Sequence, residues 1–543
     1  MHERAKEIIK QGDKLFDKRS SFISLLQDIA DHFYPERADF TSQRSLGSEF
    51  ADHLMTSAPV IARRDLGNAF NGMLRPRSKQ WFKMIAGEEG NDDTYVARWL
   101  EYATGVMRRA MYDRASQFTR ATKEGDHDFA AFGQCVISVE PSRDLTHLLY
   151  RNWHIRDCAW CENEEGVIDT LHRNWCTTPR ALVEMFKGNV HQSVKEKMEK
   201  DPYGEVKVRR VVMPSDQYAG EKKYRTPFVS LYVDIENQHI MEEVGQKRFG
   251  HVIPRWQTVS GSQYAYSPAT IVALPDARLI QAMTLTLLEA GEKAVNPPLI
   301  AEKEMFRSDI ALYSGGITYA EAVNDRRLSD VVMPLTTDKG ALGFGLDMRN
   351  DSREMIAEAF YLNKLSLPPQ GEMTAYEVGQ RVQEYIRQAL PLFEPMEQEY
   401  NGALCEETFA VLFQHGAFGS IDNIPRELLD ENIEFKFESP LHEAIEKEKS
   451  AKFYEAAQLL ATAVQIDPDA PANIDTRTAF RDALAGVGVP AKWIVPEDQA
   501  EQAYAANEAK RQIQQMTQMA IEGADGIRVG AEADKAVSEA END

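Results

Sequence analysis

Residues 261–299, GSQYAYSPATIVALPDARLIQAMTLTLLEAGEKAVNPPL, combine a turn with one long helix that has sequence signals at both ends. Ser267 is suited to cap the first free amide groups, and Pro268 occupies the first helical position, where its missing N–H costs nothing. Asn296-Pro297-Pro298 prevents the helix from continuing. Pro275 predicts a kink or a restart, so the helix from Asp276 to Val295 would be about 30 Å long. The segment therefore predicts a helical strut.

The composition predicts a protein with several domains. The chain has 543 residues, of which 43% are hydrophobic and 27% are charged, so it can bury sizeable cores. It has no run of 18 or more apolar residues, and its N-terminal sequence is charged throughout, so we expect neither a transmembrane span nor a secretory signal. Five cysteines, an odd number, do not indicate a disulfide framework, and we expect a cytosolic setting.

The formal net charge of −23 argues against a protein whose main task is to grip DNA. Tight nonspecific binding depends on lysine and arginine side chains that neutralise phosphates. If an acidic protein formed a passage for DNA, its mostly negative lining would instead repel the duplex from the wall and allow it to slide. Ordinary solubility charge is the simpler explanation for most of these residues.

The first 34 residues predict a helix that ends at Pro35. The apolar residues recur at spacings of three and four, with interruptions at Gly12 and Arg19, and a helix packed on its own domain fits these breaks better than a coiled coil. Further helices are predicted near 57–73 and 93–114. The members of the stripe are Ala5, Ile8, Leu15, Phe22, Leu26, Ile29 and Phe33.

Between residues 134 and 259 the apolar period changes to two, which predicts antiparallel strands. The clearest pattern is a hairpin, in which residues 229–235 and 239–244 flank the turn Glu236-Asn237-Gln238. Other strands are expected at 134–140, 167–175 and 206–212, with a helix at 179–187. The predicted fold class is α+β, mainly helical.

After the strut, residues 300–345 predict a small mixed segment. Asp351 with Glu354, and Thr374 with Glu377, have the spacing of capping boxes, so helices are expected to start near Ser352 and Ala375. The second of these would run to Gly416 with a kink near Pro391 and Pro395. A strand at 433–437 is expected to close the sheet, and helices follow from Ser439. Residues 495–543 contain 11 Asp and Glu against 4 Lys and Arg, and we expect a frayed acidic end.

No catalytic motif is present in the sequence, and we do not expect an enzyme or a cofactor. The patterns GxxxxGKS/T, HExxH and GxSxG are all absent. One cluster has ligands suited to zinc, because Cys158 and Cys161 are separated by two residues and other ligands lie nearby. A matched second pair is missing, so we favour buried thiols and ordinary strand histidines over a metal site. The members of the cluster are His154, Cys158, Cys161, His172 and Cys176.

A basic segment interleaves cations with aromatic residues. Its members are Arg63, Arg64, Arg75, Arg77, Lys79, Trp81 and Phe82. Such a pattern suits a nucleic-acid surface. In an acidic protein, however, arginines at a turn before an aromatic anchor are better suited to bind carboxylates, and we predict that Arg75, Arg77 and Lys79 reach acidic groups of a neighbouring subunit.

Five sequence patterns occur in an order that resembles the portal proteins, or head-to-tail connectors, of short-tailed bacteriophages. One is the strut with Ser267-Pro268, Leu274-Pro275-Asp276 and the terminal Asn-Pro-Pro. The others are GMLRPRSKQWFKM from Gly72, MTAYEVGQRVQE from Met373, SPLHEAIEKEKSAKFYEAAQLL from Ser439 and GVPAKWIVPEDQAEQA from Gly488. Each pattern is weak alone, but together they cover nearly the whole chain.

The resemblance implies a portal-type fold with a division into named parts. These are a wing (1–265), a first stem helix (266–299), a small α/β clip (300–350), a second stem helix (351–364), a tunnel loop (365–373), a long kinked wing helix with a closing strand (374–438), a helical crown (439–494) and an acidic tail (495–543). It implies a virion protein, made in the host cytoplasm, that forms a ring of twelve subunits around a DNA channel.

The resemblance also implies partners and candidate residues. The tunnel loop would face double-stranded DNA through Lys364, Leu365, Leu367, Pro368, Pro369, Gln370 and Met373. Asp325, Arg326 and Arg327 of the clip would meet the packaging motor, or terminase, and later the tail adaptor proteins. Capsid and scaffold proteins are further expected partners, and no membrane is expected.

Two other functions remain open from the sequence. A helical scaffold or adaptor protein of virion assembly would share the long helices and the acidity but would have no channel. A zinc-dependent nuclease would require the His154 to Cys176 cluster to hold metal.

Overall fold

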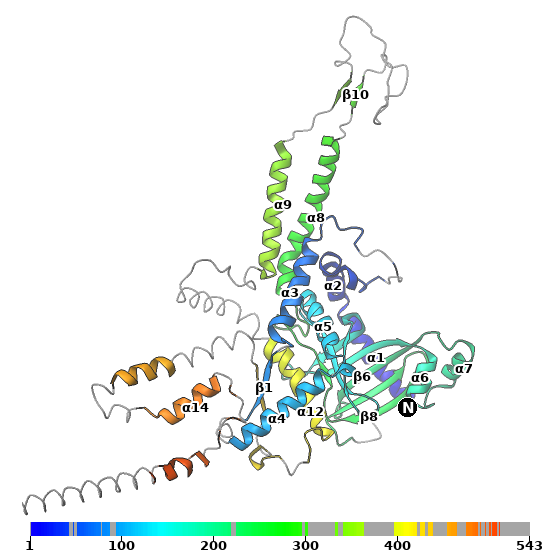
Figure 1. Cartoon of the computed structure of the whole chain (residues 1–543). Helices are drawn as coiled ribbons and strands as arrows, with labels where there is room; N and C mark the ends of the chain where they lie inside the picture. The colour runs from blue at the N-terminus through cyan, green and yellow to red at the C-terminus, as the bar shows by residue number, and fades with distance from the viewer. Residues whose placement is uncertain are drawn as a thin grey trace, which may run out of the picture. The chain divides into compact units, whose positions relative to one another are not determined.

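The computed structural model describes residues 2–42, 47, 51–77, 79–86, 94–218, 224–295, 299–301, 332–334, 340–362, 396–420, 424–428, 433–437, 453–463 and 474–486, together with 489, 493, 495, 499–500, 502–507 and 510 (Figure 1). The chain forms two compact units. The first unit consists of Met1–Lys79 and Arg109–His415, and the second unit consists of Gln80–Arg108 and Gly416–Asp543.

The first unit begins with helices α1 (His2–Lys18) and α2 (Ser20–Phe33). The predicted helix is divided into two at Arg19, which interrupts the apolar stripe, whereas α1 continues through Gly12, the other interruption of the stripe. Gly12 is needed for packing, since a Cβ atom there would lie 2.6 Å from His172 Nδ1 and would overlap Arg209. Arg19 at the break turns inward, and its Nη1 donates to Ile155 O at 2.8 Å.

A five-stranded antiparallel sheet forms the largest β element of the first unit, in the order β4-β5-β6-β7-β8. The predicted strands and the hairpin with its turn at 236–238 are confirmed, whereas β4 was not predicted. The bounds are β4 (Cys158–Glu162), β5 (Ile168–Thr177), β6 (Val206–Pro214), β7 (Phe228–Asp234) and β8 (His239–Gln246).

Helices cover both faces of this sheet (Figure 1). On one face, Ala5 and Ile8 of α1 pack against Val211, Leu231 and other buried strand residues. On the other face, α6 (Pro179–Met185) and α7 (Gln192–Lys200) bury Leu182 and Val194 against Val206 and Val208. The alternation of strand side chains therefore supplies two separate apolar layers.

A second, three-stranded sheet has the order β3-β2-β9, with β2 (Val136–Pro141), β3 (Leu148–Trp153) and β9 (His251–Val252). It packs against α5 (Phe118–Phe132) and α12 (Ala403–Gln414). Helix α3 (Ala58–Leu74) lies on α5. Tyr150 of β3 is fully buried, and its hydroxyl lies 2.7 Å from Thr408 Oγ1 of α12. This layer is the core from which the long helices extend.

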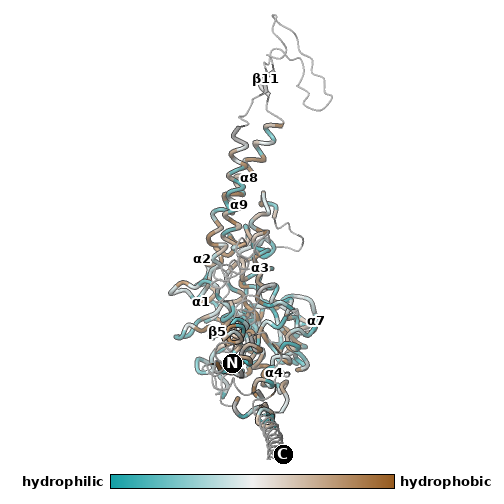
Figure 2. The backbone as a smooth tube through the Cα atoms, turned by 60° about the vertical axis from the view of Figure 1, so that its left-hand side comes forward, coloured by the Kyte–Doolittle hydropathy of each residue, from teal (hydrophilic) through white to brown (hydrophobic). Residues whose placement is uncertain are grey.

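The predicted strut is one uninterrupted helix, α8 (Pro268–Val295), and Pro275 lies inside it. It forms a hairpin with α9 (Gly340–Ala359), and the two helices run side by side in both views (Figures 1 and 2). Beyond α8, β10 (Leu299–Ala301) pairs antiparallel with β11 (Val332–Pro334). At about 1.5 Å per residue the 28 residues of α8 span roughly 42 Å.

The predicted start of the second helix near Ser352 is wrong. Helix α9 begins at Gly340, so the predicted clip segment 300–350 includes ten or more residues of the hairpin. The Asp351 and Glu354 pair lies in the middle of the helix, and Ser352 Oγ donates to Met348 O at 3.0 Å. A glycine inside α9 is explained by close packing. At position 345, a Cβ atom would lie 2.7 Å from Leu287 Cδ2 of α8.

The second unit contains most of α4 (Thr94–Met111), η8 (Arg426–Leu428), α14 (Thr476–Gly486) and a two-stranded sheet. In that sheet β1 (Phe82–Ile85) pairs with β12 (Glu434–Phe437), so the prediction that this last strand closes the larger sheet is wrong. Trp81 and Phe82 are fully buried, and the Trp81 ring stacks on Phe437 with centroids 6.4 Å apart. These aromatic residues are therefore an anchor and do not present rings to a nucleic acid.

The close approach of α8 and α9 predicts different outcomes for two glycines of one helix. Gly345→Val should lower the free energy of unfolding by about 1–3 kcal/mol, because the added atoms overlap Leu287. Gly343→Val should stay within about 0.5 kcal/mol of the parent, since no atom lies within 4 Å of its Cβ position. Urea denaturation followed by circular dichroism measures both. Equal effects would contradict the tight packing.

Glu407 of α12 predicts a pH dependence. Burial raises its pKa to about 7, although Arg248 and an amide of Gly250 oppose the shift. A carboxyl whose pKa is raised by folding stabilises the fold below its unfolded pKa of about 4.3, and this stabilisation is lost as the pH rises through about 7. Glu407→Gln should therefore be more stable than the parent at pH 8 and similar at pH 5.

Urea midpoints at the two pH values test this expectation. The control is Glu354→Gln, because Glu354 is exposed on α9 and is not among the charges that act on Glu407. If the urea midpoint of Glu407→Gln changed with pH as that of the parent does, the raised pKa of Glu407 would not be the cause of the pH dependence.

Candidate functional site: the base of the helical hairpin

Helix α8 starts directly on the end of α5. The Ser267 hydroxyl donates to Ala130 O at 2.8 Å and accepts from the amide of Thr270 at 3.4 Å. The Thr270 hydroxyl donates to Ala131 O at 2.8 Å. The predicted cap by Ser267 is confirmed, and the same oxygen also satisfies a free carbonyl at the end of α5. One buried hydroxyl thus joins two helix ends.

Gly133 makes this junction sterically possible. It ends α5 in the left-handed region, with φ at +71°, and its amide donates to Phe129 O at 2.8 Å. A Cβ atom on Gly133 would overlap the backbone of Tyr266 and Ser267. The chain that leads into α8 therefore lies directly on the end of α5, where only glycine leaves room.

The side chain of Gln281 fixes the next part of α8. Its Oε1 accepts from the amides of Met55 and Thr56 at 2.7 and 2.9 Å, and its Nε2 donates to Thr56 O at 2.9 Å. Arg278 forms an ion pair with Asp28 of α2. The buried side chains of this half of α8 are Ala269, Thr270, Ala273, Leu274, Ala277, Ile280, Gln281 and Thr284.

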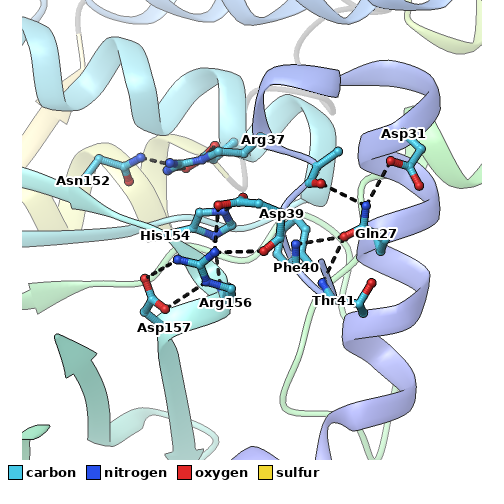
Figure 3. A network of polar contacts seen from close by, with 12 residues as sticks. Gln27, Asp31, Arg37, Asp39, Phe40, Thr41, Asn152, His154, Arg156 and Asp157 are labelled. Atoms are coloured by element: carbon cyan, nitrogen blue, oxygen red, sulfur yellow. Dashed lines mark hydrogen bonds and ion pairs between the residues drawn. The ribbon is translucent and has the colours of Figure 1, made fainter. Parts of the chain in front are cut away.

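A second glutamine and a cluster of charges hold the segment that precedes α3 (Figure 3). Gln27 Oε1 accepts from the amides of Phe40 and Thr41 at 2.9 and 3.0 Å, and its Nε2 donates to Ala38 O at 3.0 Å. Asp39 binds His154 Nε2 at 2.5 Å and Arg156 Nη1 at 2.7 Å. Burial opposes the charge of Asp39, but the hydrogen bond and charge of His154 outweigh it and lower the pKa.

The exit of α9 is also fixed inside the first unit. Ile356 and Phe360 are buried, and the Phe360 ring contacts Phe33 of α2 with centroids 5.4 Å apart. Both helices of the hairpin therefore contact α2 at the base, α8 through Arg278 and the exit of α9 through Phe360. A displacement of the far end of the hairpin can therefore reach the rest of the first unit only through the contacts at this base.

Along its whole length, the hairpin exposes many apolar side chains. These are Ile271, Val272, Leu279, Leu285, Leu288 and Val295 on α8, and Phe344, Leu346, Met348 and Met355 on α9. We call this set the apolar hairpin face. Among the described residues, α8 is the one helix long and apolar enough to cross a membrane by length and composition, which the sequence interpretation overlooked. In the lower half of α8, one side of the helix is buried and the other is exposed.

The predicted role of Arg75 is wrong. The residue is 2% exposed, its Nη1 donates to Asn401 Oδ1 at 2.6 Å, and its Nη2 pairs with Asp126. Burial opposes its charge, but Asp126 outweighs this effect and raises the pKa. Arg75 therefore binds within its own chain and does not reach a neighbouring subunit. Arg77 and Lys79 are exposed, and their assignment to a subunit interface stays a prediction.

The five residues of the zinc cluster are not brought together. Cys158 and Cys161 lie three residues apart on β4, so their side chains point to opposite faces, and burial raises the pKa of Cys158 to about 12. His154 binds Asp39, and burial with the nearby Arg209 lowers the pKa of His172 to about 3. In the part of the chain that the structure describes, no three His, Cys, Asp or Glu side chains are grouped as metal ligands.

Two sets of predicted site residues lie outside the described residues. One is the loop set Lys364, Leu365, Leu367, Pro368, Pro369, Gln370 and Met373, and the other is Asp325, Arg326 and Arg327. The described chain on either side of the second set is the β10–β11 pair. Sequence reasoning missed Gly133 and Gln281, although FAAFG at 129–133 has the signal of a helix that ends at glycine.

Gly133 and Gly166 give a matched test of the junction, because both have positive φ. Gly166 has φ at +78° with no atom within 4 Å of its Cβ position, so Gly166→Ala should cost about 1–2 kcal/mol of stability. Gly133→Ala carries the same strain and also displaces the backbone of Tyr266, so we expect a loss above ~4 kcal/mol. Thermal unfolding measures both, and similar losses would contradict the junction.

The chain resembles known proteins over most of its length. The family described as bacteriophage head to tail connecting protein matches residues 5–495. The probable portal protein of Bordetella phage BPP-1 is 24% identical over 538 residues, which cover 96% of this chain and 94% of that protein. The portal protein of Salmonella phage epsilon15 is 22% identical over 520 residues, which cover 92% and 91%.

Two solved structures of gene transfer agent particles are also similar. A chain of the native virion has a TM-score of 0.37 and 9% identity, covering 79% of this chain and 94% of that chain. A chain of the neck of the native particle has a TM-score of 0.35 and 10% identity, covering 73% and 85%.

Proposed function

The chain belongs to the bacteriophage head to tail connecting protein family and is a portal subunit of a phage virion, located at the portal vertex of the capsid. From this premise we propose that twelve copies form a closed ring around a channel for double-stranded DNA. In this ring the α8–α9 hairpins lie side by side and line part of the channel. The ring serves first for DNA packaging and later for ejection.

The apolar hairpin face is the observation that carries the proposed ring. Leu288 of α8 is 55% exposed and Phe344 of α9 is 70% exposed, within a protein that is otherwise strongly acidic. So many exposed apolar side chains on one element are typical of an interaction site. Because both helices of the hairpin carry such side chains, each hairpin can contact a neighbouring subunit, and a repeated contact between copies can close into a ring.

The anchored base supports the same function. Because Ser267, Gln281 and Phe360 tie both helices to the first unit, neighbouring hairpins would hold whole subunits at fixed angles. A ring built in this way would keep a constant channel width without contacts at its tip. The excess of acidic residues suits a passage that repels the duplex from its wall.

The partners follow from the family and from the position of the hairpin tip. We propose that the segment between β10 and β11, with Asp325, Arg326 and Arg327, binds the packaging motor and then the tail adaptor proteins. The loop from Lys364 to Met373 would face DNA, and the five-stranded and three-stranded sheets of the first unit would belong to the wing. Capsid and scaffold proteins would contact the outside of the ring.

The alternative functions are less well supported. A zinc-dependent nuclease needs the His154 to Cys176 cluster, whose side chains are separated in the described fold. An adaptor without a channel remains distinguishable from a ring by electron microscopy, which would show no central hole.

Native mass spectrometry tests the ring. Twelve copies of the 61.4 kDa chain have a mass of about 737 kDa, and a stable monomer in the presence of assembly partners would refute the proposal.

Charge placed on the apolar hairpin face should prevent closure. We expect Val272→Glu with Leu288→Glu to reduce the yield of rings at least tenfold, because each interface would bury unpaired carboxylates. The control is Val167→Glu, since Val167 is 57% exposed at a turn of the first unit outside the hairpin. Rings of normal mass from the double variant would show that this face is not the subunit contact.

A further inference from the structure

A hollow opens on the first unit beside the start of α5. It has a volume of about 320 Å³ and lies between the first turns of α5, strand β3 and the end of β5. The half-buried rings of Trp153 and Trp175 line it, together with the exposed side chains of Arg120 and Arg151. Tryptophan and arginine are enriched among the residues that contribute most to protein interfaces. The composition of the hollow therefore suits a protein partner.

Positive charge gathers at this hollow, although the chain has a net charge of −23. Arg120 pairs with Glu124 at 2.9 Å but keeps 75% of its side chain exposed, and Arg151 has no ion-pair partner among the described residues. The guanidinium carbon of the buried Arg173 lies 3.6 Å from the centre of the Trp153 ring. Its Nε and Nη1 have no hydrogen-bond partner in the described part of the chain. The hollow thus suits a carboxylate that stands beside an apolar group.

The turn between β2 and β3 carries this combination of groups. Leu145 has φ at +57°, a left-handed conformation that is strained for a bulky residue, and its side chain is 61% exposed. The neighbouring Asp144 carboxylate accepts from the hydroxyls of Ser142 at 2.6 Å and Thr146 at 2.8 Å, and these bonds lower its pKa to about 2. The turn therefore presents one carboxylate and one apolar side chain in a fixed arrangement.

The turn cannot reach the hollow of its own chain. Strand β3 runs from Leu148, next to the turn, to Trp153 in the hollow, and it alone separates them by about 17 Å at 3.3–3.4 Å per residue. Arg143 Nη2 donates to Met185 O at 2.5 Å, which fixes the turn to the end of α6. A second copy of the chain can supply the turn. A contact between two different patches is the kind that repeats from copy to copy into a ring.

We propose that the β2–β3 turn of one subunit docks in the hollow of its neighbour, with Leu145 against the two tryptophan rings and Asp144 against the two exposed arginines. This inference rests on the proposed function, because it adds a second contact between neighbouring subunits of the ring, separate from the apolar hairpin face. The contact joins the first units directly. It also explains a leucine at a position where glycine or asparagine adopts the backbone conformation more easily.

Leu145→Gly separates folding from assembly. Glycine relieves the left-handed conformation and little buried surface is lost, so the circular dichroism spectrum should match that of the parent. The concentration at which half of the chains are in rings should rise at least about tenfold, because each contact loses a buried leucine side chain. Native mass spectrometry over a dilution series measures this concentration. The control is Gln238→Gly, which has φ at +52° in the β7–β8 turn and should assemble as the parent does.

Arg151→Glu tests the hollow itself. The new carboxylate would face Asp144 of the neighbouring subunit, so rings should again require at least about tenfold more protein. The control is Arg180→Glu, because Arg180 is an exposed arginine of α6 that does not line the hollow. This variant should assemble at the concentration of the parent.

Cross-linking identifies the surfaces that meet. Chains with Leu145→Cys are mixed with chains that carry Arg151→Cys, at a concentration where rings form, and a short bis-maleimide is added. All chains also carry Cys176→Ser, because Cys176 is an exposed cysteine. We expect covalent dimers from the mixture and none from either kind of chain alone. Dimers from Leu145→Cys chains alone would place turn against turn and would overturn the proposed contact.

Three further results would overturn this contact while rings still form. They are the absence of covalent dimers from the mixture, assembly of Leu145→Gly at the concentration of the parent, and equal maleimide labelling of Arg151→Cys in rings and in free subunits. The last result would show that the hollow stays open in the ring. Absence of rings from the parent chain would instead refute the proposed function, so the two failures can be distinguished.

Discussion

The double use of the Ser267 hydroxyl is the interaction on which the placement of the hairpin depends. One oxygen completes the end of α5 and the start of α8, so the two helices cannot be moved apart without leaving buried polar groups unpaired at both ends. Gly133 allows this contact, because its missing Cβ atom lets the backbone of Tyr266 lie on the end of α5. The direction of the 28-residue helix is therefore set by three residues at its base.

The contacts at the base of the hairpin are polar, whereas the rest of the hairpin is mostly apolar. Helix α8 has the composition of a membrane span, yet its lower half uses Gln281 and Arg278 to bind backbone and a carboxylate of the first unit. These contacts fix the helix in one orientation, which apolar packing alone does less well, since apolar contacts are not directional. The upper half is then free to offer apolar surface to neighbouring subunits.

The sequence predicted the elements whose ends have local chemical signals. The cap at Ser267, the helix that extends to Val295 and the hairpin turn at 236–238 depend on neighbouring residues, and all three are in the structure. The start of α9 was misplaced because Gly340, Gly343 and Gly345 suggest a loop. In fact Gly345 is where α8 approaches closely, and packing between helices overrides the low helix propensity of glycine.

The candidate site was harder to predict because its partners are distant in the sequence. Asp126 is 51 residues from Arg75, and Asn401 is 326 residues away, so a basic stretch before an aromatic anchor gave no sign that Arg75 turns inward. The thiols of Cys158 and Cys161 are kept apart for a simpler reason. A spacing of three suits a metal in a loop, but on a strand it directs the two thiols to opposite faces.

The inward arginines also change what the net charge means. Among the described residues, six arginines and four carboxylates are buried, so the interior retains a net charge of +2 by formal count. The buried charges of the described residues therefore contribute nothing to the negative net charge of −23 of the sequence. Cations that might have bound phosphates instead hold Asp126, Glu140 and backbone carbonyls inside the fold. A chain that uses its arginines in this way leaves an acidic exterior, which is the electrostatic condition under which a DNA duplex passes a protein wall without adhering to it.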